Sequence, residues 1–169
     1  MAKLLVTCRD LYGEFRTKLC IRDAFEDPEI SSSGFRAVLH VEIEGNVLEL
    51  AEMMIRECFY DIGRVVPVLY EGNSTLTELK ELAIKTALEN IGEEESICFR
   101  LHKRGAHGLD KPTPEIEYEV GGSIHDALTK KYGKKPKVDL KSADITVISE
   151  VLGPLVEVGI TRKNWWEEE

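Results

Sequence analysis

The run KVDLKSADITVISEVLGPLVEVGI, residues 137–160, is the most regular part of the chain. Residues 145–152 and 155–160 are two apolar runs separated by Gly153-Pro154, which is the spacing of a β-hairpin. The shorter run 137–140 predicts one more strand just before them. We therefore expect three strands in this part of the chain.

Two helices and a strand are predicted upstream of the hairpin. Residues 75–90 place their apolar side chains on one helical face, and Gly92 marks the end of that helix. Residues 96–102 alternate as in a strand, with Ile97, Phe99 and Leu101 on one side.

Residues 114–132 fit a helix or, in part, a strand. Apolar residues recur there every fourth position, which favours a helix, but Ile116, Tyr118 and Val120 also alternate. Gly121 and Gly122 cost a helix roughly 1 kcal/mol each relative to alanine. We expect a helix over 114–132.

The first 71 residues predict a β-α-β-α-β order of ferredoxin-like type. Strands are expected at 3–8, 35–44 and 65–71, with Pro67 at a sheet edge. A helix over 9–24 would turn Leu11, Phe15 and Leu19 to the core, and Asn46 would cap the second helix. Residues 26–34 predict a loop, and 71–75 predict the domain boundary.

Length and composition predict a soluble globular protein with one ordinary domain or two small ones. The chain has 169 residues, 43% of them apolar, with no run long enough to cross a bilayer and no signal peptide, so we expect a cytoplasmic location. Its four cysteines are far apart and form no CxxC pair, so we expect free thiols and no disulfide or zinc site.

Charge is distributed unevenly along the chain. The net charge is −9, and residues 1–92 hold 16 acidic and 10 basic residues. Residues 100–141 hold 6 acidic and 10 basic residues, together with three of the four histidines. A cationic segment in an anionic chain points to a polyanionic partner.

The centre of the cationic segment is FRLHKRGAHG, residues 99–108. On an extended strand Arg100, His102 and Arg104 share one face, where they would repel one another unless an anion lies there. The lysine-rich run 130–137 has a plainer explanation, because cations are favoured at a helix C-terminus without any ligand.

Familiar catalytic signatures are absent from the sequence. It contains no GxGxxG after a strand, no GxxxxGK[ST], no HExxH and no GxSxG. Its histidines have no helical metal-ligand spacing. A binding module is therefore favoured over an enzyme, with no cofactor and no metal.

Residues 75–161 resemble the THUMP domain, a tRNA-binding module of tRNA-modification proteins. The resemblance rests on the Lys103-Arg104 pair after the strand and on VDL followed by DI-x-V in KVDLKSADITV. Ala143 stands where that family usually has proline. The resemblance implies an α+β protein with an N-terminal ferredoxin-like domain (1–71), a THUMP domain with a mixed sheet (72–161) and an exposed tail (162–169).

The resemblance also implies a function. We expect no catalytic domain after residue 161, so the chain is most similar to the non-catalytic adaptor that presents tRNA to a separate cytidine acetyltransferase for N4-acetylcytidine formation. In the family, the THUMP domain and the domain before it hold the acceptor end of tRNA. The expected partners are tRNA and that acetyltransferase, with no membrane.

The expected RNA-binding residues fall into two groups. Lys103 and Arg104 follow from the resemblance, and their neighbours on the strand face and in the turn are added. A second group follows from charge alone. The complete set is Arg100, Lys103, Arg104, His107, Lys111, Lys134, Lys135, Lys137 and Lys141. Tyr118 and Tyr132 are possible stacking platforms, although a core position is the plainer reading of both.

Two other functions remain open. The chain could be the THUMP subunit of another tRNA-modification enzyme, a methyltransferase or thiouridine synthetase, whose catalytic domain is a separate chain. It could also be a small ferredoxin-like phosphohydrolase that holds an anion with Arg9 or Arg36.

Overall fold

The computed structural model describes residues 1–167 and contains two compact units. Met1–Val68 and the described residues from Trp165 onward form the first unit, and Leu69–Asn164 form the second. The division falls just before the expected boundary at 71–75, because strand β5 (Tyr70–Asn73) already pairs within the second sheet. The expected exposed tail is wrong at two points: the last strand, β8 (Leu155–Arg162), continues to Arg162, and Trp165 is only 5% exposed.

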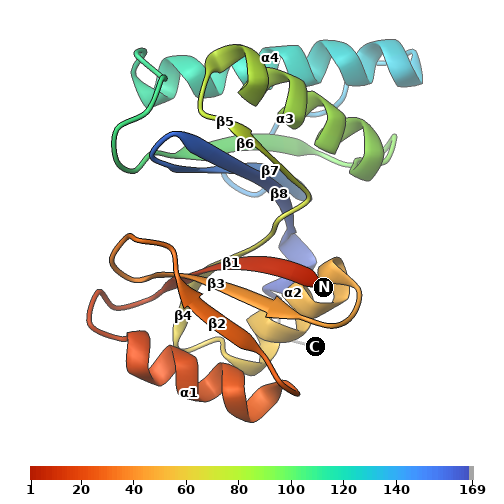
Figure 1. The fold of residues 1–169 in the computed structure, drawn as a ribbon. Coiled ribbons are helices and arrows are strands. Elements are labelled where there is room, and N and C mark those ends of the chain that lie inside the picture. Colours follow the sequence, from red (N-terminus) through yellow and green to blue (C-terminus); the bar gives the residue numbers. More distant parts are fainter. Residues whose placement is uncertain (168–169) are drawn as a thin grey trace. The chain divides into compact units, whose positions relative to one another are not determined.

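The first unit has the β-α-β-β-α-β order of a ferredoxin-like fold. Its strands are β1 (Ala2–Cys8), β2 (Glu29–Ser32), β3 (Val38–Ile43) and β4 (Ile62–Pro67). They form one antiparallel sheet in the order β2-β3-β1-β4, so β4 with Pro67 lies at an edge as expected. Helices α1 (Glu14–Ala24) and α2 (Val47–Glu57) lie on the same side of the sheet (Figure 1).

The sequence missed strand β2, which lies in the expected loop 26–34. Its side chains are exposed or half-buried, and it pairs only with β3 at the edge of the sheet. A strand with no buried face carries no apolar alternation, so backbone pairing alone identifies it.

The expected core face of α1 is also wrong. The helix begins at Glu14 and buries Thr17 and Ile21, whereas Leu11, Phe15 and Leu19 are 60%, 72% and 43% exposed. The Thr17 hydroxyl donates to the carbonyl oxygens of Gly13 and Asp61, which satisfies a polar group in the buried position. The cap of α2 is confirmed, since the Asn46 side chain accepts from the Leu48 and Glu49 amides.

A disulfide joins α1 to the end of α2. Cys20 and Cys58 are bonded, with their Cα atoms 6.0 Å apart, which corrects the expectation of four free thiols. Cys8 and Cys98 are buried and free, and burial is the main reason that the pKa of each thiol is raised. The two bonded cysteines are 38 positions apart in sequence, so only the packing of the two helices brings them together.

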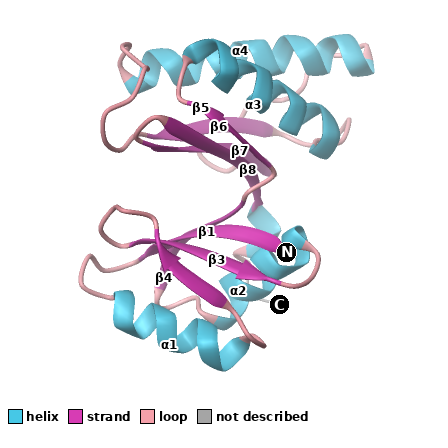
Figure 2. Ribbon diagram, viewed as in Figure 1, coloured by secondary structure: helices cyan, strands magenta, loops and turns pink. Residues whose placement is uncertain are grey.

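The second unit is a mixed sheet covered on one face by two helices. The strand order is β5-β8-β7-β6, and only β6 (Ile97–His102) and β7 (Ile145–Leu152) run parallel. Helices α3 (Leu76–Asn90) and α4 (Thr113–Tyr132) pack on each other over the same face of the sheet (Figure 2). The mixed sheet and both helices confirm the expectation from the sequence.

The hairpin is confirmed, but the strand before it is wrong. β7 pairs with β8 (Leu155–Arg162) through the turn at Gly153, after which a short 3-10 helix, η1 (Lys163–Trp165), follows. The expected strand 137–140 is reduced to one bridge between Val138 and Ile97. Val138 and Leu140 are 56% and 64% exposed, so this segment is not part of the core.

No helix among the described residues is long and apolar enough to cross a membrane.

Candidate nucleic-acid interface

The turn after β6 has a fixed backbone. The Gly153 amide donates to the Arg104 carbonyl at 2.8 Å, and the Gly108 amide donates to the Ser74 carbonyl at 3.1 Å. A Cβ atom on Gly108 would lie 2.9 Å from that same carbonyl oxygen, which explains the glycine. Leu109 is buried and anchors the end of the turn. The basic turn is therefore held against the hairpin and the start of α3.

Carboxylates of the chain itself face both arginines of this region. Arg100 Nη1 lies 3.7 Å from Glu117 Oε1, and its Nη2 also donates to the Leu140 carbonyl. Arg104 Nη1 lies 2.9 Å from Glu150 Oε2, and its side chain is only 17% exposed. The expectation that these arginines require an external anion is therefore wrong.

Lys103, His107 and Lys111 are also engaged within the chain. Lys103 Nζ donates to the carbonyl of Lys111 at 2.5 Å, and His107 Nδ1 accepts from the Leu109 amide at 3.1 Å. Lys111 Nζ lies 3.6 Å from Glu119. Among the described residues, no carboxylate pairs with Lys103, so of these three it remains the best placed to meet an anion.

The unpaired lysines lie beyond the C-terminus of α4. Lys134 pairs with Glu93 and Glu94. Lys135, Lys137 and Lys141 are exposed, and within residues 1–167 none of them has a carboxylate within ion-pair distance. The positive surface therefore centres on the segment 135–141, which the sequence reasoning ranked second.

Sequence reasoning missed Lys163, which lies beside this segment. Its amide donates to the Asp144 carbonyl at 3.0 Å, and its charge helps to lower the pKa of Asp139 and Asp144. The hairpin register could have found it, because Arg162 pairs with Ile145 across the two strands. In an antiparallel hairpin the next pair outward from Ile145 and Arg162 is Asp144 and Lys163, so a sequence-based register already places these two residues opposite each other.

Two aspartates fix the backbone that carries these lysines. Asp139 Oδ1 accepts from the Lys141 and Ser142 amides, as expected for a turn residue. Asp144 Oδ2 accepts from the Ser96 amide at 2.9 Å, and the Asp144 amide donates to the Ser96 hydroxyl. Backbone hydrogen bonds are the largest cause of the lowered pKa of both carboxyls.

The lowered pKa of Asp144 predicts a pH response. A depressed pKa means that the ionised carboxylate stabilises the fold above the unfolded value of about 3.9, and this contribution is lost as pH falls through the folded pKa. We expect Asp144→Asn to lower the free energy of unfolding between pH 5 and 8, where the wild-type carboxylate is ionised and contributes in full, and the difference from wild type to shrink as pH falls below about 4. Carboxyl titration by NMR, with equilibrium unfolding at each pH, measures both effects. An Asp144 pKa at or above 3.9 would contradict the expectation.

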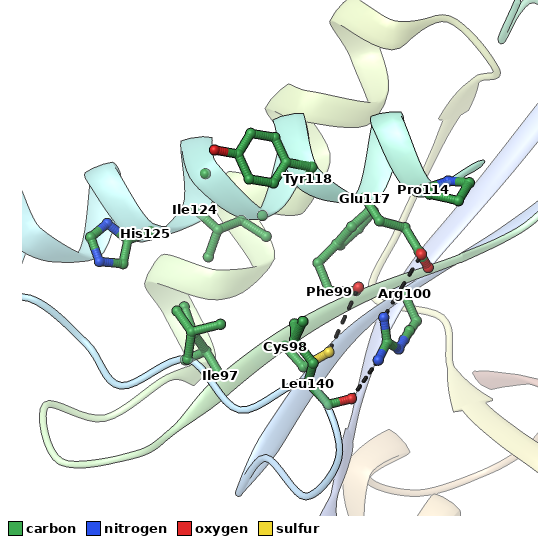
Figure 3. A pocket seen from close by; sticks show the side chains of 13 residues that line it. Ile97, Cys98, Phe99, Arg100, Pro114, Glu117, Tyr118, Ile124, His125 and Leu140 are labelled. Atoms are coloured by element: carbon green, nitrogen blue, oxygen red, sulfur yellow. Dashed lines mark hydrogen bonds and ion pairs between the residues drawn. The ribbon is translucent and has the colours of Figure 1, made fainter. Parts of the chain in front are cut away.

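An apolar groove borders the lysine segment. It has a volume of about 490 Å³ and lies between β6, α4 and the loop that contains Val138 and Leu140. Tyr118 is 87% exposed at its edge, so the sequence-based core position for this ring is wrong. Figure 3 shows His125 toward one end of the groove and the Arg100–Glu117 pair toward the other. Lys137 and Lys141 flank in sequence the two residues that the loop contributes.

Gly121 and Gly122 line the groove although the fold does not require glycine there. A Cβ atom on Gly121 would meet only Phe99 Cβ, at an ordinary 3.9 Å, and one on Gly122 would meet nothing within 4 Å. Both glycines lie inside α4, where they weaken the helix. Positions that break a local rule without structural need are typical of functional sites.

The second glycine provides a stability prediction. Because Gly122 has helical geometry and open space around it, Gly122→Ala should raise the free energy of unfolding by about 1 kcal/mol. Urea denaturation measures the change, and a lower free energy of unfolding would show that the glycine is needed by the fold.

The groove is apolar, with an exposed ring at its edge and lysines on the loop that borders it. Among the described residues, no group of three or more His, Cys, Asp or Glu side chains could hold a metal ion. Cys98 lines the groove, but burial raises its thiol pKa, which disfavours the nucleophilic thiolate. An apolar groove with an exposed aromatic ring and nearby unpaired cations can hold a flat ring attached to an anion.

Arg9 and Arg36, the two arginines of the phosphohydrolase hypothesis, both contact other groups of the chain. Arg9 donates to the carbonyls of Phe59 and Ile62 and lies over the Phe59 ring. Arg36 lies over the Tyr12 ring. No observation in the described residues favours that function.

Comparison with known proteins identifies the second unit. A model of the THUMP domain family matches residues 73–160. PH1313 from Pyrococcus horikoshii Ot3 is similar in structure, with a TM-score of 0.59, 18% identity, and coverage of 96% of this chain and 55% of that chain. No curated protein matches the sequence at a significant level.

Two further structures share the fold across both units. TrmN from Thermus thermophilus has a TM-score of 0.58 and 18% identity, over 96% of this chain and 46% of that chain. A 4-thiouridine synthetase, solved in complex with RNA and bound ATP, has a TM-score of 0.57 and 15% identity, over 96% and 42%. The chain thus spans about half the length, or less, of these solved proteins, and at these identities the likeness concerns the fold.

Proposed function

Because the chain belongs to the THUMP domain family, we propose that it binds tRNA and presents it, without catalysing the reaction, to a separate cytidine acetyltransferase that forms N4-acetylcytidine. The observation that carries tRNA binding is the exposed, unpaired lysine segment 135–141 beside an apolar groove in a chain of net charge −9. Lysines that lie beyond ion-pair distance of the described carboxylates gain most from a phosphate, because binding breaks no ion pair.

The groove suits an unstacked nucleotide at the acceptor end of tRNA. Single-stranded nucleic acid combines phosphate contacts with stacking of bases on aromatic rings. Tyr118 offers such a ring at the edge of the groove, and the flat surface at Gly121 and Gly122 leaves room for a base. Lys137 and Lys141 lie on the same loop as Val138 and Leu140, so base and phosphate contacts would come from one segment.

The Tyr118→Ala variant distinguishes the contribution of base stacking to tRNA affinity from the contribution of positive charge. We expect tRNA affinity to fall roughly 5- to 100-fold, which corresponds to the 1–3 kcal/mol of one stacked base. The salt dependence should stay unchanged, because no cation is removed. Fluorescence anisotropy with labelled tRNA at several salt concentrations measures both quantities. Tyr60→Ala is the matched control, since this ring is 81% exposed in the other unit. An unchanged affinity in Tyr118→Ala would exclude stacking on this ring.

The adaptor role needs a test in the cell. Nucleoside analysis of total tRNA after deletion of the gene should show loss of N4-acetylcytidine alone. The similarity to a 4-thiouridine synthetase supports a second candidate, a THUMP subunit that serves a thiouridine synthetase on a separate chain. A methyltransferase on a separate chain is the other form of this candidate. Loss of 4-thiouridine or of a methylated nucleoside would favour that candidate and exclude the acetylation adaptor.

A further inference from the structure

The first unit has an exposed apolar surface that its own fold leaves uncovered. We call it the α1 patch and define it by Leu11, Tyr12, Phe15, Leu19 and Tyr60. Their exposed fractions are 60%, 83%, 72%, 43% and 81%. Leu11, Tyr12 and Tyr60 line one hollow of about 720 Å³, and Phe15 and Leu19 follow at helical spacing on α1.

The area of the α1 patch is that of an interface. A buried aromatic side chain covers 150–250 Å², so at the observed exposures the three rings alone present roughly 350 to 590 Å². The largest apolar patch on a typical monomer is of this size and is often functional. A standard interface takes about 800 Å² from each partner, and an obligate dimer takes more. With its two leucines the patch approaches the first value, so a second copy of this chain is the less favoured occupant.

The charges around the α1 patch favour a protein over RNA. Arg9, Arg16, Asp10 and Asp61 all line the hollow, so its formal charge is balanced. Residues 1–68 as a whole hold 12 acidic and 8 basic residues, which repel a polyanion. Aromatic rings with arginine, in place of lysine clusters, are the composition of protein–protein interface centres.

Two arginines indicate the chemistry of the occupant. Arg16 and Arg22 are exposed on α1, and within the described residues neither has a carboxylate at ion-pair distance. Asp23 follows Arg22 in the sequence and limits the excess of positive charge on the helix. An occupant that fits presents apolar side chains to Phe15 and Leu19 and carboxylates to the two arginines.

We infer that the α1 patch is the docking surface for the catalytic partner, through an apolar segment of that protein bordered by acidic residues. This inference rests on the adaptor function proposed above. It assigns the enzyme to the α1 patch of the first unit and the RNA phosphates to the lysine segment 135–141 of the second unit.

The experiment uses the full chain and the purified tRNA cytidine acetyltransferase of the same organism. Phe15→Glu/Leu19→Glu adds charge at two exposed positions, where the fold tolerates it. We expect its affinity for the enzyme to fall at least about 30-fold, as for hot-spot residues, and its affinity for tRNA to stay within twofold. Met53→Glu is the matched control on α2, where Met53 is 46% exposed, and it should bind both partners normally.

Each other outcome has a defined meaning. Undiminished enzyme binding by the double variant overturns the docking surface and leaves the adaptor function standing. Loss of tRNA binding in the double variant would show that the patch contacts RNA. A sedimentation coefficient of the double variant below that of the wild-type chain would show that the patch is a homodimer contact. Either result overturns the inference. If the wild-type chain binds tRNA but not the enzyme, the adaptor function itself fails and the inference fails with it.

Discussion

Replacing Lys135, Lys137 and Lys141 together by alanine is expected to weaken tRNA binding roughly 100-fold. An ion pair in a water-like dielectric is worth about 1 kcal/mol at 4 Å, so three contacts supply about 3 kcal/mol. No carboxylate within residues 1–167 lies within ion-pair distance of the three lysines. Backbone hydrogen bonds lower the pKa of Asp139 and Asp144 more than Lys141 and Lys137 do, so removal of the lysines should have only a small effect on the stability of the fold. Binding measured by filter retention or anisotropy should also depend less on salt, with a log–log slope shallower by about 2 to 3.

The matched control removes the same number of positive charges elsewhere. Lys18 and Arg22 belong to α1 of the first unit, and Lys85 belongs to α3, so none of them is part of the loop that borders the groove. Their triple alanine variant should leave the salt slope within about 0.5 of the wild-type value. Equal losses in both triple variants would show that net charge, and not the 135–141 segment, determines affinity. That result would remove the observation on which tRNA binding rests.

A variant of Arg104 would test the stability of the fold more than RNA binding. Arg104 neutralises Glu150, whose side chain is fully buried, so Arg104→Ala would disturb the fold together with any RNA contact. A loss of tRNA binding in that variant would not identify a phosphate contact. The lysines and Tyr118 are better probes of the interface because they are exposed and not required for packing.

The fold was predictable where apolar periodicity and capping residues agree. Helix α3, the β7–β8 hairpin and the Asn46 cap all have strong local signals, and the structure confirms them. The prediction failed for β2, which has no buried side chain, and for α1, where apolar residues lie on both faces of the helix. In α1 the exposed apolar residues dominated the pattern, and the buried Thr17 gave no signal.

The sequence located the cluster of cations that forms the candidate interface, but not which of these cations the chain itself neutralises. Clustered cations identified the segment 100–141, because charge is read directly from composition. Which cations are free depends on Glu117 and Glu150, and these lie 17 and 46 positions from the arginines that they neutralise. The groove was not predictable, because it forms where β6, α4 and the loop at 138–140 meet. Long-range partners and cavities follow from tertiary packing, which no local pattern encodes.

The disulfide provides the largest expected stability effect. It closes a loop with a sequence separation of 38, and the chain-entropy relation for such a loop gives about 4 kcal/mol of stabilisation. Cys20→Ser should therefore lower the free energy of unfolding by about this amount, measured by urea denaturation under non-reducing conditions. Dithiothreitol should shift the wild-type midpoint to that of the variant and leave the variant unchanged. Four free thiols in the unreduced protein would contradict the prediction.

Reduction of the disulfide also tests whether the two units bind their partners independently. Cys20 follows Leu19 of the α1 patch, whereas all of the tested RNA-binding residues lie in Leu69–Asn164. Reduction should therefore weaken enzyme binding, because a less stable α1 presents the patch less often, and it should leave tRNA affinity within about twofold. Cys8→Ala is the control for loss of a thiol, since Cys8 is buried and free. Equal losses of enzyme and tRNA binding on reduction would show that the second unit depends on the disulfide of the first.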